Sequence, residues 1–225
     1  MTPPSAPRAR LASSTAVAAV VVALFSMLPS RAVASAEWQK YGERDGIETY
    51  GQPIDPDGFV SFKGVATLDA TLEDVVTAMR DNTTASNWMP MVQERRDLAV
   101  LSDDHRIELT RLSLPWPCTD RYFIDEARIL PQPDGSVILT IESVPAPDKS
   151  WLRPELVLGT FRLSQFVLKR VDGGRKTSLV FELRTSANGS MPNWLVSAAQ
   201  QSWPFDLVTG LREELVRRSE KMRRS

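Results

Sequence analysis

The chain has 225 residues, and its 27 lysines and arginines against 28 acidic residues give a formal net charge of −1. Nucleic-acid-binding proteins normally carry a basic excess on one face, so this balance argues against a nucleic-acid partner. The single cysteine, Cys118, excludes an internal disulfide. Together with the single histidine, His105, it leaves too few ligands for a structural zinc site.

Residues 1–36 have the pattern of a secretory signal peptide. A basic start is followed by an apolar run over 16–28 and by small-residue cleavage positions within 32–36. The apolar run is short for a membrane-spanning helix, which needs about 20 residues. An uncleaved membrane anchor is the alternative. We therefore expect an exported, periplasmic protein whose single mature domain is 37–225.

The beginning of the mature chain predicts short elements of both kinds. Residues 37–46 are polar with Trp38 and Tyr41 three apart, which favours a short helix. Strands are predicted over 47–52 and 59–68, on either side of a segment rich in proline and glycine.

The next segment predicts an amphipathic helix. Thr71 and Asp74 have the spacing of a capping box. Apolar residues then recur with helical spacing and share one face. They are Leu72, Val75, Val76 and Met79.

A series of β-like runs follows an irregular segment at 81–91. Turn-forming residues separate the runs, and consecutive strands joined by short turns predict an antiparallel sheet. The predicted strands are 92–101, 106–114, 121–130, 137–144, 156–171 and 177–185.

The chain ends with a long helical pattern that runs from about Trp194 to Arg218. Its apolar residues fall at steps of four, and Pro204 predicts a kink near Trp203. A helix of about 25 residues is about 37 Å long, enough to cross a sheet. The fold class is therefore α+β, a curved antiparallel sheet around one long terminal helix, with a cavity between them. The apolar stripe is Leu195, Ala199, Trp203, Leu207, Leu211 and Leu215.

Three motifs follow one another along the chain: Asp81 with Trp88-Met89-Pro90, Pro115-Trp116-Pro117 with Asp120-Arg121-Tyr122-Phe123, and Gly189 with Pro192 and Trp194. Their order and spacing make the chain similar to the START (steroidogenic acute regulatory protein-related lipid transfer) domain family, in its bacterial branch. The resemblance covers about 38–218, and it implies a helix-grip fold with an internal hydrophobic tunnel that holds one lipid. It also implies that 112–119 is the gating loop of that tunnel.

The resemblance also suggests where ligand contacts lie. Glu108 falls where sterol-binding relatives place a cavity carboxylate, but Ala127 stands at the position of their cavity arginine. Trp116 is interpreted as a gate or membrane contact, or else as a plug of the core. Trp88 is also consistent with core packing, and Arg121 with a structural clamp beside Asp120. The candidate ligand-binding residues are Glu108, Trp116, Arg121, Phe123, Trp88, Trp203 and Leu207.

The sequence thus predicts a monomeric, exported lipid-binding or lipid-transfer protein that needs no cofactor and touches membranes transiently. The alternative is an enzyme of the same superfold, such as a cyclase or hydrolase acting on an apolar substrate. Cys118 has no sequence neighbour that would activate it as a nucleophile. A third hypothesis is a membrane-tethered binding module, if the signal segment is not removed.

Overall fold

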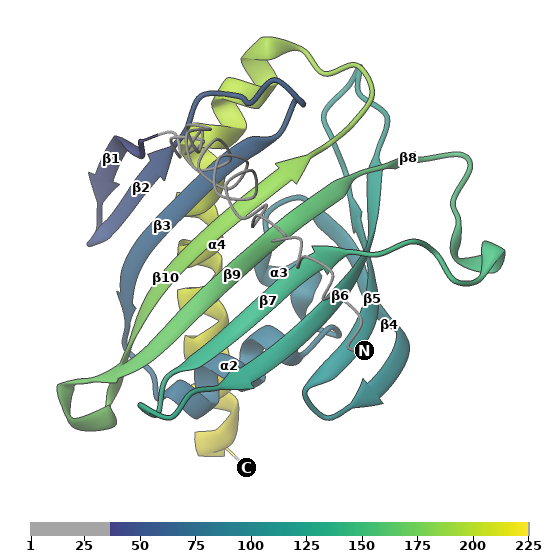
Figure 1. Ribbon diagram of the computed structural model, residues 1–225. Coiled ribbons are helices and arrows are strands. Elements are labelled where there is room, and N and C mark those ends of the chain that lie inside the picture. The colour runs from purple at the N-terminus through teal and green to yellow at the C-terminus, as the bar shows by residue number, and fades with distance from the viewer. Residues whose placement is uncertain (1–36, 225) are drawn as a thin grey trace, which may run out of the picture. The chain divides into compact units, whose positions relative to one another are not determined.

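The computed structural model describes residues 37–224, so the predicted signal peptide lies outside the described residues. Within that part of the chain, ten strands form one large sheet (Figure 1). Their bounds are β1 Gln39–Arg44, β2 Ile47–Gly51, β3 Val60–Leu68, β4 Val92–Ser102, β5 His105–Leu112, β6 Arg121–Pro131, β7 Val137–Ser143, β8 Val157–Leu158, β9 Thr160–Val171 and β10 Lys176–Ser186. The strand order is β1-β2-β3-β10-β9-β7-β6-β5-β4, and β8 pairs with β6.

The sheet is antiparallel, as the short turns predicted, except that β8 runs parallel to β6. The predicted strand 156–171 is two strands in the structure, because the chain breaks at Gly159. A Cβ at Gly159 would lie 2.2 Å from the Phe123 ring, so only glycine allows this approach. The chain therefore touches β6 briefly and then crosses to β7 and β10.

Three α-helices of the described chain pack on one face of the sheet (Figure 1). They are α2 Leu72–Arg80, the single turn α3 Ala85–Trp88, and α4 Asn193–Arg224. Two short 3-10 turns, η2 Lys149–Trp151 and η3 Asp172–Gly174, lie in connections between strands. The sheet order, the long terminal helix and the face that it covers confirm the predicted helix-grip architecture.

The predicted amphipathic helix is α2. The Thr71 hydroxyl accepts a hydrogen bond from the Asp74 amide at 3.2 Å and donates one to the Asp74 carboxylate at 2.7 Å. These bonds satisfy an amide that the helix itself leaves free at its N-terminus. Leu72, Val75 and Met79 are buried against the sheet and α4, as the spacing predicted.

Helix α4 buries the predicted stripe along its whole length. Leu195, Leu207, Leu211 and Leu215 are buried, while Ala199 and Trp203 are half-buried. The helix continues to Arg224, beyond the predicted end at 218, and contains Pro204. Among residues 37–224, no helix is both long and apolar enough to span a membrane.

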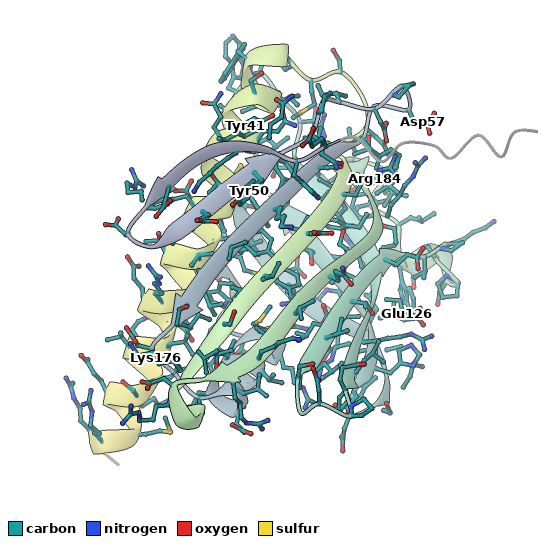
Figure 2. All side chains as sticks on the ribbon, turned by 60° about the vertical axis from the view of Figure 1, so that its left-hand side comes forward. Tyr41, Tyr50, Asp57, Glu126, Lys176 and Arg184 are labelled. Atoms are coloured by element: carbon teal, nitrogen blue, oxygen red, sulfur yellow. The ribbon has the colours of Figure 1, made fainter. Side chains whose placement is uncertain are left out.

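The prediction of a helix over 37–46 is wrong, because this segment forms β1. Asp45 and Gly46 have φ values of 54° and 68°, the left-handed conformation that a two-residue hairpin turn requires. Tyr41 then covers Gly51 of the facing strand, where a Cβ would come within 2.3 Å of the ring. Figure 2 shows Tyr41 and Tyr50 on this hairpin at one edge of the sheet. The Asp45-Gly46 pair is a local signal for a hairpin turn, and it outweighs the helical spacing of Trp38 and Tyr41.

Candidate functional site: an apolar chamber between the sheet and α4

An apolar chamber of about 380 Å³ lies between the sheet and the first half of α4. Strands β3, β5, β6, β9 and β10 form one side of it, and the first turns of α4 form the other. Two aromatic pairs belong to its walls: Phe62 with Trp203, and Phe123 with Phe161, at centroid distances of 6.0 and 4.7 Å. The sheet and the apolar stripe of α4 thus produce the predicted cavity.

Three segments close the mouth of this chamber. They are the loop before β3, the loop between β5 and β6, and the loop that leads into α4, which all reach the same end of the sheet (Figure 1). Exposed apolar side chains lie on the first two of these segments and in the first turn of α4, next to the third. They are Ile54, Trp116 and Trp194, which are 49%, 90% and 61% exposed.

Polar contacts fix the base of the loop between β5 and β6, the segment that the resemblance identifies with the gating loop. The Asp120 carboxylate accepts hydrogen bonds from Arg111 at 2.7 Å and from the Leu114 amide at 3.2 Å. The bond from the Arg111 guanidinium holds the pKa of Asp120 below its usual range. The peptide bond between Trp116 and Pro117 is cis. Asp120 thus anchors the base of the loop, while Trp116 extends into solvent at its tip.

Arg121 joins two of the mouth segments from behind the chamber wall. Its side chain is among the fully buried ones. The guanidinium donates hydrogen bonds to the carbonyls of Ala187, Asn188 and Ser190, at 3.0, 3.1 and 3.4 Å, and also to that of Thr119. Arg121 is not among the residues that line the chamber. These contacts are those of a structural clamp between β6 and the segment before α4.

A second, smaller chamber of about 40 Å³ lies deeper, next to α3 and the middle of α4. It shares no lining residue with the larger chamber. Trp88, Glu108 and Leu207 belong to its walls. The indole nitrogen of Trp88 is buried and has no hydrogen-bond partner within residues 37–224. A water molecule occupies about 30 Å³ in the liquid, so this chamber has room for about one ordered water. The unpaired indole N–H of Trp88 could donate a hydrogen bond to it.

Glu108 has an arginine partner although Ala127 stands at the position of the cavity arginine of sterol-binding relatives. The partner comes from β4 and not from β6. Arg95 of β4 donates to its carboxylate at 2.6 Å, and both side chains are at least nine-tenths buried. Asn82 donates to the other oxygen at 3.2 Å, and Arg106 lies 3.8 Å away. The arginine that pairs with Glu108 thus comes from β4 and not from position 127 of β6.

A second buried acid, Asp125, lies directly opposite Glu108 in the β5–β6 register. Its carboxylate accepts a hydrogen bond from Ser143 at 2.6 Å. Burial raises the pKa of Asp125 from 3.8 to about 7, and the nearby Glu108 charge contributes in the same direction. Desolvation dominates because the aspartate is 3% exposed and no cation among residues 37–224 bonds to it directly.

A larger groove, of about 600 Å³, lies away from both chambers, between α2 and the last turns of α4. Its walls carry many charged side chains, and two of its arginines are already paired. Arg217 and Arg218 bond to Glu214 at 3.0 and 2.8 Å. The groove is therefore a charged surface feature, and the apolar chamber of about 380 Å³ is the better ligand site.

The structure divides the predicted contact residues among four places. Phe123 and Trp203 line the larger chamber. Trp88, Glu108 and Leu207 line the smaller one, Trp116 is exposed at the mouth, and Arg121 is buried behind the wall.

Sequence reasoning missed Arg95, Asp125 and Phe161. Alternation along β6 placed Asp125 on the same face as Phe123, so its burial could have been found from the sequence. The pairing of Arg95 could not, because bulges interrupt the β4–β5 register and decide the direction of its side chain.

A curved antiparallel sheet closed by a long helix over an apolar chamber defines a protein of the hydrophobic-ligand-binding class. The START domain family matches residues 17–220, and the chain belongs to that family. An uncharacterized protein of Pseudomonas aeruginosa is 21% identical over 185 residues, which are 81% of this chain and 88% of that one.

Solved structures show the same fold. A STAR-related lipid transfer protein fragment from Xanthomonas axonopodis has a TM-score of 0.69 at 25% identity, over 79% of this chain and 98% of that one. Human StAR-related lipid transfer protein 5 has a TM-score of 0.72 at 18% identity, over 88% of this chain and 94% of that one. Human STARD10 has the same TM-score at 20% identity, over 86% and 80%.

Proposed function

We propose that the protein is an exported carrier that takes up one hydrophobic lipid into the larger chamber and delivers it between membranes, without chemical turnover. The observation that carries the proposal is the apolar chamber of about 380 Å³ under α4, in a chain of the START domain family. The names of its structural relatives support lipid transfer as the process. The signal-peptide pattern of residues 1–36 supports export.

The mouth supports transient membrane contact. Ile54, Trp116 and Trp194 are exposed apolar side chains on three different segments that all border the chamber. Tryptophan is favoured at the boundary between lipid headgroups and water. A protein that rests on a bilayer through these side chains presents the chamber mouth to the lipids below it.

The first experiment is native mass spectrometry, with lipid extraction, on the protein purified from its own host. We expect one lipid per chain. Ala199 and Ala198 offer matched variants, because Ala199 lines the chamber and its neighbour Ala198 is exposed on the other side of α4. Ala199→Trp fills the chamber and should remove the bound lipid, while Ala198→Trp should retain it. A protein that stays free of lipid after incubation with membranes would contradict the carrier function.

A further inference from the structure

The walls of the larger chamber carry almost no charge. Asp57 is the single ionisable side chain among the lining residues of the described chain. It lies at the rim, where its carboxylate is 66% exposed and pairs with Arg162 at 3.0 Å. Figure 2 shows Asp57 and Arg184 at the same end of the sheet, far from Lys176. The interior of the chamber therefore offers no cation to an ionised headgroup.

The cations nearest to the mouth already have partners. Arg162 also stacks on the Phe59 ring at 3.9 Å, and Arg184 pairs with Asp55. Arg121 donates to backbone carbonyls behind the wall. An anion that entered the chamber would have to break one of these contacts or remain unpaired, and a buried unpaired charge is costly.

The polar groups of the wall bond mainly to the protein itself. Thr185 donates to the Thr160 carbonyl at 3.2 Å, and Ser186 donates to the Asn188 side chain at 2.9 Å. The amide nitrogen of Asn188 bonds to the Leu158 carbonyl at 2.8 Å. These groups lie at the end of β10 and in the segment after it, so the polar part of the wall is on the mouth side.

The inner end of the chamber excludes anions as well. Beyond it lie the two buried acids, Glu108 and Asp125, and the small chamber of about 40 Å³. The guanidinium of Arg95 is occupied by Glu108 at 2.6 Å. The other arginines that line the small chamber also have partners: Arg80 bonds to the Asp103 carbonyl, Arg106 to Asp97 and Arg128 to Glu126. A carboxylate or phosphate that reached this point would meet two acidic side chains, arginines that are already paired and a space of about one water.

The volume of the larger chamber limits the size of the ligand. A methylene group occupies about the same volume as a water in the liquid, about 30 Å³. The chamber of about 380 Å³ therefore has room for about 13 such groups. About a dozen methylene groups span one leaflet, half of the roughly 30 Å hydrocarbon core of a bilayer. One chain, or a fused-ring body of similar size, fits this space, and two chains do not.

We propose that the larger chamber selects an uncharged lipid of single-chain size and rejects both ionised fatty acids and two-chain phospholipids. This inference rests on the proposed carrier function and specifies its ligand. The headgroup that fits is a hydroxyl or ester, which remains near the polar mouth while the apolar body fills the chamber.

The test is a competition between three probes with 12-carbon chains, monolaurin, laurate and dilauroylphosphatidylcholine, added in equal amounts and read by native mass spectrometry at a pH where laurate is ionised. We expect monolaurin on the protein in at least tenfold excess over each of the other two. Laurate or the phospholipid bound as well as monolaurin would overturn the inference but leave the carrier function intact. Binding of none of the probes, with no lipid retained from the host, would overturn the carrier function itself.

A variant that introduces a positive charge tests the cause of the selectivity. Val196 lines the chamber from α4, and Val196→Lys introduces a cation at the wall. We expect this variant to raise the share of bound laurate at least tenfold relative to the wild type. Unchanged selectivity in a folded variant would show that wall charge does not decide the ligand. Thr185→Lys, from the opposite wall, repeats the test if Val196→Lys does not fold.

Discussion

Asp125 is expected to make the stability of the protein depend on pH. Its pKa is about 7 in the folded chain, against 3.8 for an ordinary aspartate. Between these values the folded state holds a proton that the unfolded chain has released, so stability falls as pH rises. Each whole step in pKa corresponds to about 1.36 kcal/mol, so the cost of ionising Asp125 is at most about 4 kcal/mol well above pH 7.

Asp125→Asn removes this cost while retaining the acceptor for Ser143. We expect the variant to be more stable than the wild type by about 2–4 kcal/mol at about pH 8.5, and about equally stable at about pH 4. The measurement is urea unfolding of both proteins at the two pH values, followed by tryptophan fluorescence. A stability difference that is the same at both pH values would refute the reasoning.

Asp134→Asn is the matched control with the opposite sign. Bonds from Ser136, and a further one from Lys169, lower the pKa of Asp134 to about 2. An acid with a lowered pKa stabilises the folded state above its ordinary pKa of 3.8, and this contribution is lost as pH falls toward 2. Asp134→Asn should therefore destabilise the protein at neutral pH and have little effect in strong acid.

Three further predictions follow from particular contacts. Arg95→Met leaves Glu108 buried without its main partner and should lower the free energy of unfolding, measured in urea, by about 3–5 kcal/mol. Adding Glu108→Gln to this variant should recover much of the loss. No recovery would mean that the two side chains are not coupled. Gly210→Ala would place a Cβ 2.1 Å from the Trp88 carbonyl oxygen. Thermal unfolding should therefore show a stability lower by about 1–3 kcal/mol, although alanine has the better helix propensity. A stabilised variant would contradict this packing. Trp116→Ala should leave stability unchanged, because the side chain is 90% exposed. The variant should associate more weakly with neutral vesicles in a flotation assay. Undiminished flotation would exclude Trp116 from the membrane contact.

Periodicity determined how much of the fold the sequence could predict. The helix α2 and the stripe on α4 were predicted correctly because spacing of three and four residues directly reports a buried helix face. The edge strand β1 was missed because its conformation depends on pairing with β2, and its polar residues lack the alternation of a half-buried strand. The break at Gly159 was missed because it depends on the position of Phe123 in another strand.

The site was predictable to a different extent. Phe123 and Trp203 line the larger chamber, as predicted. Their placement was predictable because local sequence pattern determines which face of a strand or helix a residue occupies. The pairing of Glu108 with Arg95 depends on a diagonal contact across bulged strands, for which a single sequence carries no signal. The role of Arg121 is similar, since its carbonyl partners lie 66 to 69 residues further along the chain.

The energetics of the chamber explain why the mouth, rather than the depth of the site, should control loading. Moving about 13 methylene groups out of water is worth about 10 kcal/mol, at about 0.8 kcal/mol for each group. A lipid that leaves a bilayer gains almost none of this, because its chain is already in an apolar medium. The net preference between bilayer and chamber is then decided by wall packing and by the headgroup at the mouth. We therefore expect substitutions of the exposed Trp116, or of Asp120 at the anchored base of its loop, to change the rate of that exchange.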